Sequence, residues 1–346
     1  MKLSLLDWLA CPACGDGAFS LRIDREERLP VYEGHFEPGE ETPGRQDGSL
    51  VEVVEGLLTC RDCAGAYPVT EGIPRLLPPG GEPGPTTGHR LTEFDGYVRQ
   101  YEESFLDLVA PLGAEDFVGR LVLDAGCGFG RHAFFAARYG AEVVALDSSP
   151  DAVASAYRNL RSQLRAHVVL GDVRRPPLRK QIFDLVYSLG VLHHVVDSGL
   201  ALAALHELVK PGGRFSTWVY GPRQGLTRIA TGALRGATAQ MQPKELLRFS
   251  QVIAAALRVF SHTPHRFFGQ LPVLSAVVTH LPVHDHSRWP FDVVVADVYD
   301  RLRIPVTEYF MGEDLERWYA EAGYADIRVT RRVRNTESFR GTGVRR

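Results

Sequence analysis

The feature that most constrains this chain is segment 121–131, where an apolar run ends in an acid and glycines follow at every second position. Residues 121–123 predict a buried strand, and the residues from Arg131 onward are compatible with a helix. Glycine lets the backbone turn sharply and lets a ligand lie against it. Strand, glycine-rich turn and helix together predict a nucleotide-type cofactor site at this turn.

The spacing of the turn indicates which kind of cofactor it suits. Dinucleotide-binding turns favour G-x-G-x-x-G, with a pyrophosphate on the helix N-terminus. This chain instead has Asp124-x-Gly126-x-Gly128-x-Gly130, which places a carboxylate at the turn itself. A carboxylate repels a pyrophosphate and can pair with an ammonium group, so the pattern favours a cofactor that carries positive charge.

Downstream of the turn, predicted strands and helices alternate. Strands are expected at 142–146, 167–170, 183–188 and 214–219, with a helix over 198–209, and this order predicts a doubly wound, mostly parallel α/β sheet. Two acids follow these strands. Asp147 lies 21 positions after Gly126, where a ribose diol is commonly hydrogen-bonded, and Asp172 could accept from an adenine amino group.

From Asp124 to Phe215, in order and without a gap, the series resembles the class I S-adenosylmethionine (SAM) methyltransferases often called type 11. The resemblance implies a seven-stranded Rossmann-like sheet, SAM as cofactor, and a position for Asp124 near the methionine end of SAM. We therefore expect the cofactor-binding residues to be Asp124, Ala125, Gly126, Cys127, Gly128, Gly130, Asp147, Ser148, Asp172, Val173 and Ser188.

Aromatic residues at 94, 97, 101 and 105 lie on one face of a predicted amphipathic helix before the sheet. This face could simply be core. In related methyltransferases the corresponding helix often covers the cofactor, so Tyr97 and Tyr101 are also candidates to lie over SAM.

Four of the five cysteines form two Cys-x-x-Cys pairs, Cys11/Cys14 and Cys60/Cys63. Two such pairs supply four thiolates for a structural Zn²⁺ ion, with a disulfide or redox pair as the alternative. The 45 residues between the pairs exceed the usual ribbon spacing, and we expect the excess to be an inserted loop over 25–49. Cys127 is expected to pack as a small apolar group.

The sequences around both cysteine pairs, Leu5 to Pro12 and Cys63 to Pro78, resemble Trm112-type zinc ribbons. In that family the ribbon supports or activates methyltransferases, usually as a separate subunit, and here it would be fused in cis. The expected domains are a ribbon over 1–77, a Pro/Gly-rich linker over 78–90, and a methyltransferase domain over 91–346.

Residues 221–310 form an insertion after the fifth strand, and we expect them to form a helical lid that selects the acceptor. They include a helix over 244–260. Transfer to a hydroxyl or ammonium acceptor needs a base. The candidates are His193, His194, His284 and His286, and the last two could instead bind a metal. Arg301, Arg303 and Tyr309 are weaker candidates for contacting an anionic acceptor.

Composition limits the possible partners. A net charge of −3 argues against a strong polyphosphate binder, although residues 328–346 hold seven arginines and one acid. That tail is expected to be a solvated β-edge with a frayed end, or else a contact for an anionic substrate. No apolar stretch approaches the length of a membrane span, and residues 1–8 do not form a signal peptide, so we expect a cytoplasmic protein without a membrane partner.

Three functions follow from these features. The favoured one is transfer of a methyl group to an O or N atom of a small molecule. The second is methylation of rRNA or tRNA through the ribbon and the arginine tail. The third is a zinc-anchored scaffold that transfers nothing.

Overall fold

The computed structural model describes residues 1–15, 17–32, 46–85, 99–222, 226–268, 289–304, 308–332 and 338–346. The chain divides into two compact units. One consists of Met1–Gly84, Tyr97–Pro222 and Val306–Arg346, and the other of Pro85–Gly96 and Arg223–Pro305. The ribbon region and the sheet therefore belong to one unit, and most of the predicted lid forms the other.

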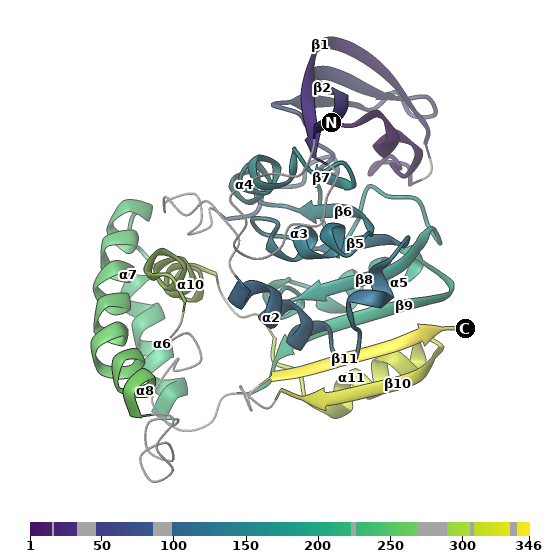
Figure 1. Ribbon diagram of the computed structural model, residues 1–346. Helices are drawn as coiled ribbons and strands as arrows, with labels where there is room; N and C mark the ends of the chain where they lie inside the picture. Colours follow the sequence, from purple (N-terminus) through teal and green to yellow (C-terminus); the bar gives the residue numbers. More distant parts are fainter. Residues whose placement is uncertain are drawn as a thin grey trace. The chain divides into compact units, whose positions relative to one another are not determined.

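A seven-stranded mixed sheet forms the centre of the first unit (Figure 1). Its order is β10-β11-β9-β8-β5-β6-β7, in which β11 is antiparallel to both of its neighbours and the other pairs are parallel. The predicted α/β fold is confirmed. The strands are β5 (Leu121–Ala125), β6 (Glu142–Asp147), β7 (Ala166–Leu170), β8 (Phe183–Leu189), β9 (Val209–Tyr220), β10 (Tyr324–Arg331) and β11 (Ser338–Arg345).

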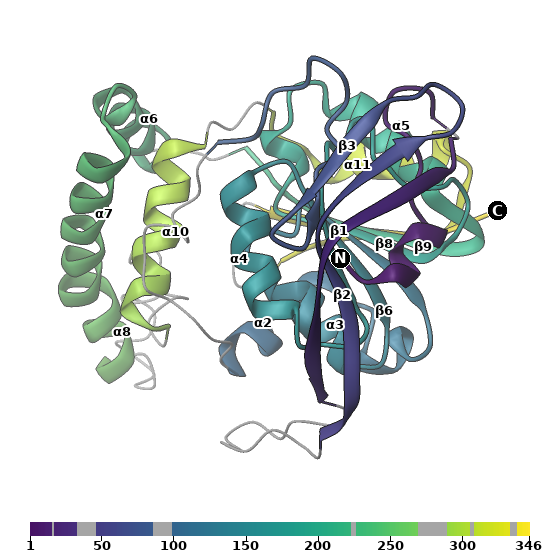
Figure 2. The same ribbon diagram turned by 90° about the horizontal axis from the view of Figure 1, so that it is seen from above.

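Helices cover both faces of this sheet, with α2, α3 and α4 on one side and α5 and α11 on the other (Figure 2). Local signals set their ends. The Ser149 hydroxyl accepts from the Ala152 amide at 3.4 Å to cap α4, and Gly140 and Gly323 take left-handed φ angles of 91° and 80° after α3 and α11. The helices are α2 (Arg99–Val109), α3 (Arg131–Arg138), α4 (Pro150–Leu160), α5 (Ser198–Leu208) and α11 (Gly312–Glu321), with 3₁₀ turns at Leu3–Asp7, Ala114–Phe117 and Leu192–His194.

The N-terminal ribbon is an antiparallel sheet in the order β1-β2-β3-β4, formed by β1 (Phe19–Tyr32), β2 (Gln46–Cys60), β3 (Ala66–Thr70) and β4 (Ile73–Pro74). The predicted inserted loop over 25–49 is wrong for its described part, because β1 and β2 pair from Phe19↔Cys60 to Tyr32↔Gln46. Arg25 lies opposite Glu55, and both side chains are exposed. A hairpin that is solvated on its faces carries polar cross-strand pairs and lacks apolar alternation, so its strands give a weak sequence signal.

The ribbon docks on the free edge of the seven-stranded sheet. Arg75 forms a parallel bridge with Leu170 of β7, and the Leu76 amide donates to the Leu170 carbonyl at 2.8 Å. Leu9 forms a second bridge with Leu178. An uncovered edge strand is a template for aggregation, so the ribbon protects this side of the sheet.

A buried polar contact fixes the ribbon against α4. Glu52 of β2 is 2% exposed and accepts from the Tyr157 hydroxyl at 2.7 Å. Gly72 lies against the same ring with φ 79°, and a Cβ atom there would lie 2.1 Å from the Tyr157 oxygen. The Lys2 ammonium donates to the carbonyl oxygens of Gln163 and Ala166. Buried charges that are hydrogen-bonded in this way set a single docking geometry.

The solvated edge predicted for the tail is confirmed for β10, which is the edge strand of the sheet and leaves Arg328 and Arg331 exposed, whereas the frayed C-terminal end is wrong. Residues 338–345 form β11, which lies between β9 and β10 rather than at an edge. Arg332 and Arg340 pair with Asp107 of α2 at 2.5 and 3.1 Å, and Arg345 donates to the His206 carbonyl at 3.0 Å. These three arginines are bound within the fold, which weakens the argument for an anionic substrate on the tail, while Arg328, Arg331 and Arg346 are exposed.

The second unit is helical and consists of α6 (Leu226–Thr238), α7 (Pro243–Leu257), a π-helical turn (Arg258–His262), α8 (Thr263–Phe268) and α10 (Phe291–Arg303). The predicted helix over 244–260 is confirmed, with Pro243 in its first turn. Ala254 of α7 packs against Val294, Val295 and Val298 of α10. Among the described residues, no helix is long and apolar enough to cross a membrane.

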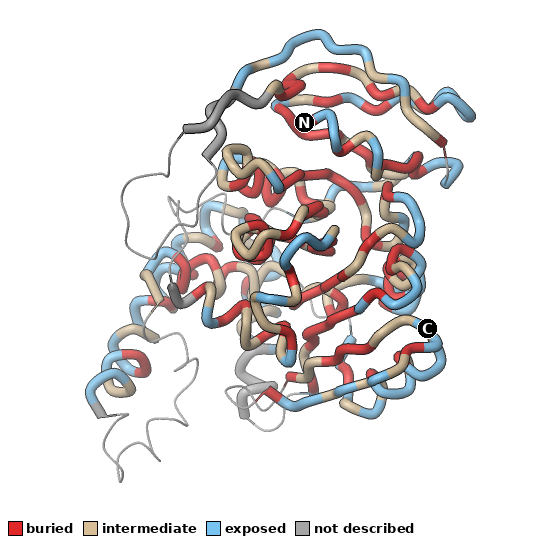
Figure 3. The backbone as a smooth tube through the Cα atoms, turned by 45° about the vertical axis from the view of Figure 1, so that its right-hand side comes forward, coloured by how far each residue is buried: buried red, intermediate tan, exposed pale blue. Residues whose placement is uncertain are grey.

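Figure 3 shows that buried residues concentrate in the strands of the large sheet and in the helix faces against them. The four strands β5, β6, β7 and β8 are almost wholly buried, as expected for parallel strands covered on both faces.

Candidate functional site

The three glycines of the turn have left-handed backbone angles, with φ of 89°, 56° and 86° at Gly126, Gly128 and Gly130. A Cβ atom at Gly126 would lie 2.3 Å from Val191, and one at Gly130 would lie 2.9 Å from Leu160. At Gly128, by contrast, a Cβ atom would meet nothing within 4 Å. The outer glycines are therefore required for packing, whereas the middle one borders open space in which a ligand could lie.

Several amides of this turn are already hydrogen-bonded within the protein. Gly126 and Cys127 both donate to the Leu146 carbonyl, at 2.8 and 2.9 Å, and Gly130 donates to the Cys127 carbonyl at 3.0 Å. The Gly128 amide donates to the Asp147 carboxylate at 2.9 Å. A pyrophosphate site needs such amides free. The turn is therefore poorly suited to a dinucleotide, in agreement with the glycine spacing.

Asp147 ends β6 beside the turn, as predicted. Its carboxylate accepts from the Gly128 and Ser149 amides, both at 2.9 Å. Burial raises the pKa of Asp147, and these amide bonds oppose the rise. Each carboxylate oxygen has two lone pairs, so both oxygens keep capacity to accept from a ribose diol.

Asp124 lies underneath the turn rather than on its surface. Its side chain is 0% exposed, and within the described part of the chain neither carboxylate oxygen has a hydrogen-bond partner of normal geometry. Burial raises its pKa to about 8, although the Tyr187 hydroxyl on the neighbouring strand opposes this rise. The proposed proximity to the methionine end of SAM stays a prediction, and Asp124 acts from below the turn if it acts on the cofactor.

The other predicted cofactor residues have different surroundings. Both oxygens of Asp172 accept from the Arg174 guanidinium, Oδ1 at 3.1 Å and Oδ2 at 2.7 Å, so an adenine amino group would share this acceptor. The Ser188 hydroxyl is buried and donates to the Ala125 carbonyl at 3.0 Å, which joins β8 to β5. Val173 is 8% exposed.

The carbonyl of Ser148 accepts from the Gly84 amide at 2.8 Å. The middle of the predicted linker therefore lies against the carboxyl end of β6 at Gly84. Sequence reasoning missed this contact, because a linker composition carries no signal for where the segment lies.

Tyr101 lies in α2 close to the turn. Its ring is 0% exposed, meets the Phe129 ring edge-on at 5.9 Å, and lies 5.6 Å from the Arg131 guanidinium. This burial favours the core-packing alternative for Tyr101. Tyr97 lies outside the described residues.

The two histidines after β8 have distinct environments. The Tyr220 amide donates to Nδ1 of His193 at 3.3 Å, and the two rings stack with 3.9 Å between centroids. A neutral His193 therefore carries its proton on Nε2 and is not arranged as a base through Nδ1. His193 is buried and His194 is half-buried, so His194 is the better placed candidate.

Among the candidates from segment 221–310, Tyr309 lies beside the histidines after β8, because the Glu308 amide donates to the His193 carbonyl at 3.3 Å and the Phe310 amide to the Tyr220 carbonyl at 3.0 Å. His284 and His286 lie outside the described residues. Arg301 pairs with Asp297 within α10 at 2.6 Å, Arg303 is half-buried, and Tyr309 is 42% exposed.

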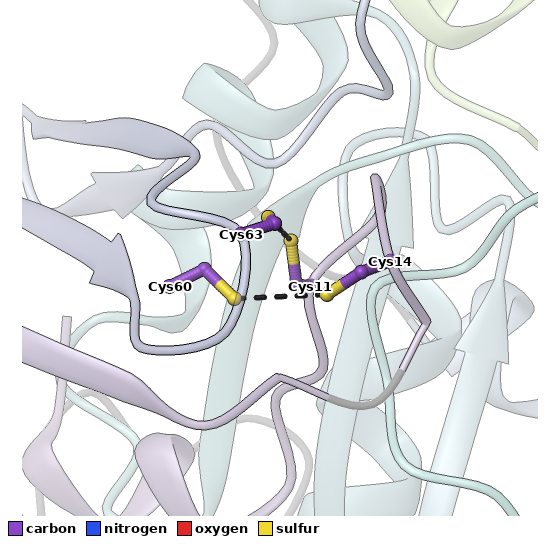
Figure 4. Close-up of side chains that lie close together, drawn as sticks. All are labelled: Cys11, Cys14, Cys60 and Cys63. Atoms are coloured by element: carbon purple, nitrogen blue, oxygen red, sulfur yellow. Dashed lines mark hydrogen bonds between the residues drawn. The ribbon is translucent and has the colours of Figure 1, made fainter.

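The four predicted zinc ligands converge, as Figure 4 shows. Their Sγ atoms all lie within 4.8 Å of one another, with Cys11–Cys63 at 3.6 Å and Cys14–Cys60 at 3.7 Å. A tetrahedral zinc with Zn–S bonds of about 2.3 Å places its sulfurs about 3.8 Å apart, so the cluster fits this ion. All four cysteines are free thiols, contrary to the disulfide alternative. Gly17 is required beside them, because a Cβ atom there would lie 2.1 Å from the Cys60 sulfur.

Comparison with known proteins agrees with both family resemblances of the sequence. Residues 123–217 match the family model described as a methyltransferase domain, and residues 2–72 match the model described as Trm112p-like protein. The chain is 33% identical over 147 residues to the malonyl-[acyl-carrier protein] O-methyltransferase of Pseudescherichia vulneris, covering 42% of this chain and 53% of the relative. It is 38% identical over 116 residues to the ubiquinone biosynthesis O-methyltransferase of Alkalilimnicola ehrlichii, covering 32% of this chain and 47% of the relative.

Among solved structures, the magnesium protoporphyrin IX methyltransferase of Synechocystis shares 18% identity with a TM-score of 0.43, covering 75% of this chain and 93% of that one. The chain spans about half the length of the curated relatives it matches.

Fold and comparisons together define the class: the seven-stranded unit has the Rossmann-like α/β fold of a methyltransferase domain, and residues 123–217 match that domain's family model. In this chain, the domain follows a Trm112p-like ribbon whose cysteine cluster fits zinc.

Proposed function

We propose that this chain is a SAM-dependent methyltransferase that transfers a methyl group to an O or N atom of a small-molecule acceptor. The observation that carries the proposal is the turn at Gly126–Gly130, whose amides are bound internally while its middle glycine borders open space beside the Asp147 carboxylate. That arrangement suits a nucleoside cofactor without a pyrophosphate. The small-molecule relatives support this acceptor class.

When bound, SAM supplies a methyl group on a sulfonium sulfur, which leaves as a neutral thioether and needs no acid. The protein must hold the acceptor in line with the methyl carbon and, for a hydroxyl or ammonium acceptor, remove a proton. In this proposal Asp147 holds the ribose, and the turn orients the rest of the cofactor. Among the described candidates, the half-buried His194 is the one we assign to proton removal.

The two alternatives are weaker. Methylation of RNA loses support because Arg332, Arg340 and Arg345 of the tail are bound inside the fold. A scaffold that binds no cofactor has no reason to keep open space at Gly128 beside a carboxylate.

Replacing Asp147 tests the cofactor site. We expect Asp147→Asn to weaken SAM binding by at least about tenfold, because an amide replaces a charged acceptor for the ribose hydroxyls. Isothermal titration calorimetry measures the affinity. Asp24→Asn is the matched control, since Asp24 lies exposed on the ribbon hairpin and pairs only with Arg22 among the ion pairs of the described residues.

Wild-type protein that binds no SAM would refute the proposed function. Binding that Asp147→Asn leaves unchanged would refute only the assigned role of Asp147. Tight, salt-sensitive RNA binding would favour the RNA alternative.

A further inference from the structure

Large apolar side chains are exposed along one stretch of the helical unit, from α7 through the π-helical turn into α8. Val252 is 66% exposed, Val259 59%, Phe260 75% and Phe267 71%. Val252 and Val259 are seven residues apart, as are Phe260 and Phe267, and seven residues are about two helical turns, so the four side chains follow one side of consecutive helical segments. We call these four side chains the apolar stripe.

The apolar stripe is not the side of α7 that builds the core of this unit. Leu246, Ser250 and Ala254 are buried on the other side of α7, and Ala254 packs against the valines of α10. A surface helix normally has one apolar face directed to the core and a polar face directed to solvent. α7 and α8 therefore carry apolar surface beyond what their own unit buries, and such surface marks an interaction site.

The charges of segment 226–268, which carries the stripe, are mostly positive. Between Leu226 and Phe268 the only acid is Glu245, whose carboxylate accepts from the Gln242 amide at 3.0 Å to cap α7. The same segment holds six basic residues: Arg228, Lys244, Arg235, Arg248, Arg258 and Arg266. Lys244 and Arg248 are exposed and precede Val252 by two turns and one turn, and the exposed Arg266 adjoins Phe267. The stripe thus has cations at both ends.

We propose that the apolar stripe and its flanking cations dock this chain on the surface of a bilayer that contains anionic lipid. Phenylalanine and valine side chains enter the boundary between headgroups and acyl chains, while Lys244, Arg248 and Arg266 contact the anionic headgroups. A nucleic acid matches the cations but offers no favourable partner for the exposed valines. The helices lie in the interface and do not span it, which agrees with their length and polarity.

This inference is independent of the proposed methyl transfer, and it departs from the absence of a membrane partner expected from the sequence. Hydropathy windows detect spanning helices and respond weakly to a short stripe on an otherwise polar helix.

Co-sedimentation with lipid vesicles tests the inference on the full chain. We expect binding to vesicles of phosphatidylcholine mixed with phosphatidylglycerol, little binding to phosphatidylcholine alone, and weaker binding as salt rises. The double substitution Phe260→Ser with Phe267→Ser is expected to lower the partition coefficient at least tenfold. Lys244→Gln with Arg248→Gln is expected to lower it only for the anionic vesicles.

The matched control is Val118→Ser with Ile23→Ser, which removes apolar side chains that are 64% and 43% exposed in the other unit and should leave vesicle binding unchanged. Circular dichroism checks that every variant is folded. The inference is overturned if wild-type protein binds neither vesicle, or if the phenylalanine variant binds as the wild type does. It is also overturned if sedimentation shows a dimer that this variant dissociates, since the stripe would then be an interface between two copies of the chain.

Discussion

Replacing Cys60 by serine is expected to abolish metal binding and to unfold the ribbon. Wild-type protein should contain about one zinc ion per chain, because the four sulfurs fit a closed tetrahedral site. Binding of a structural zinc contributes on the order of 10 kcal/mol to folding of a small domain. We therefore expect the ribbon of Cys60→Ser to be unfolded at room temperature, so that its unfolding transition is missing from a thermal scan.

The damage should extend beyond the ribbon. Residues Arg75 and Leu76 cover the β7 edge, and Leu9 pairs with Leu178, so an unfolded ribbon leaves this edge free to pair with another chain. We therefore expect aggregation on chelation, together with faster amide exchange in 166–170.

Metal analysis measures the loss of zinc, and thermal denaturation measures the unfolding of the ribbon. Cys127→Ser is the matched control, since Cys127 is buried in the glycine turn and lies outside the cluster. It should keep the full zinc content. A Cys60→Ser protein with undiminished zinc would contradict the four-thiolate site.

The elements that could be predicted from the sequence are those that bury apolar residues on both faces or end at a strong local signal. The strands β5 to β8 are continuous apolar runs, and Gly140, Ser149 and Gly323 mark helix ends. The failures lie where these signals are absent. The hairpin of β1 and β2 is paired through exposed charges, and β11 carries two glycines and two arginines in a strand whose interior position depends on β9 and β10.

The sequence predicts where the candidate site lies in the fold, but not the surroundings of its individual side chains. Asp124 and Asp147 each end an apolar strand, and nothing local distinguishes them. Their environments differ because Asp124 lies next to Tyr187 in the β5–β8 register, beneath the turn, whereas Asp147 faces the turn amides. In the same way, His193 and His194 are neighbours in the sequence with no local difference, and the packing of His193 against Tyr220 gives the two side chains different environments. Such differences arise from tertiary contacts between distant segments.

Asparagine at position 124 is expected to stabilise the cofactor-free protein while weakening its affinity for SAM. Burial raises the pKa of Asp124 from 3.8 to about 8, so the folded protein holds a proton that the unfolded chain releases above about pH 4. Stability is therefore greatest below about pH 4, falls as pH rises toward 8, and is level above that value. Because an amide is neutral at every pH, Asp124→Asn should remove this decrease in folding stability with rising pH.

At pH 8 we expect the variant to be more stable than the wild type by about 1–3 kcal/mol, seen as a Tm higher by several degrees. At pH 4 the two proteins should have nearly the same Tm. SAM carries a sulfonium and an ammonium, and an ionised Asp124 beneath the turn would stabilise them through a poorly screened interior. We therefore expect the affinity of the variant for SAM to be at least about tenfold lower at pH 8, measured by calorimetry.

Asp184 provides a control because its pKa is lowered in the folded protein, whereas the pKa of Asp124 is raised. Partial burial tends to raise its pKa, but hydrogen bonds from Lys210 at 2.6 Å and from the Leu121 amide at 2.9 Å lower it overall. Its contribution to stability is present at neutral pH and is lost as pH falls through the lowered pKa, so Asp184→Asn should be less stable than the wild type at pH 8. If Asp124→Asn is destabilised at pH 8 as Asp184→Asn is, then Asp124 is ionised and partnered in the folded protein. The Asp124 carboxylate would then stabilise the fold under the turn in its ionised form, and its ionisation would not depend on the binding of a cationic cofactor.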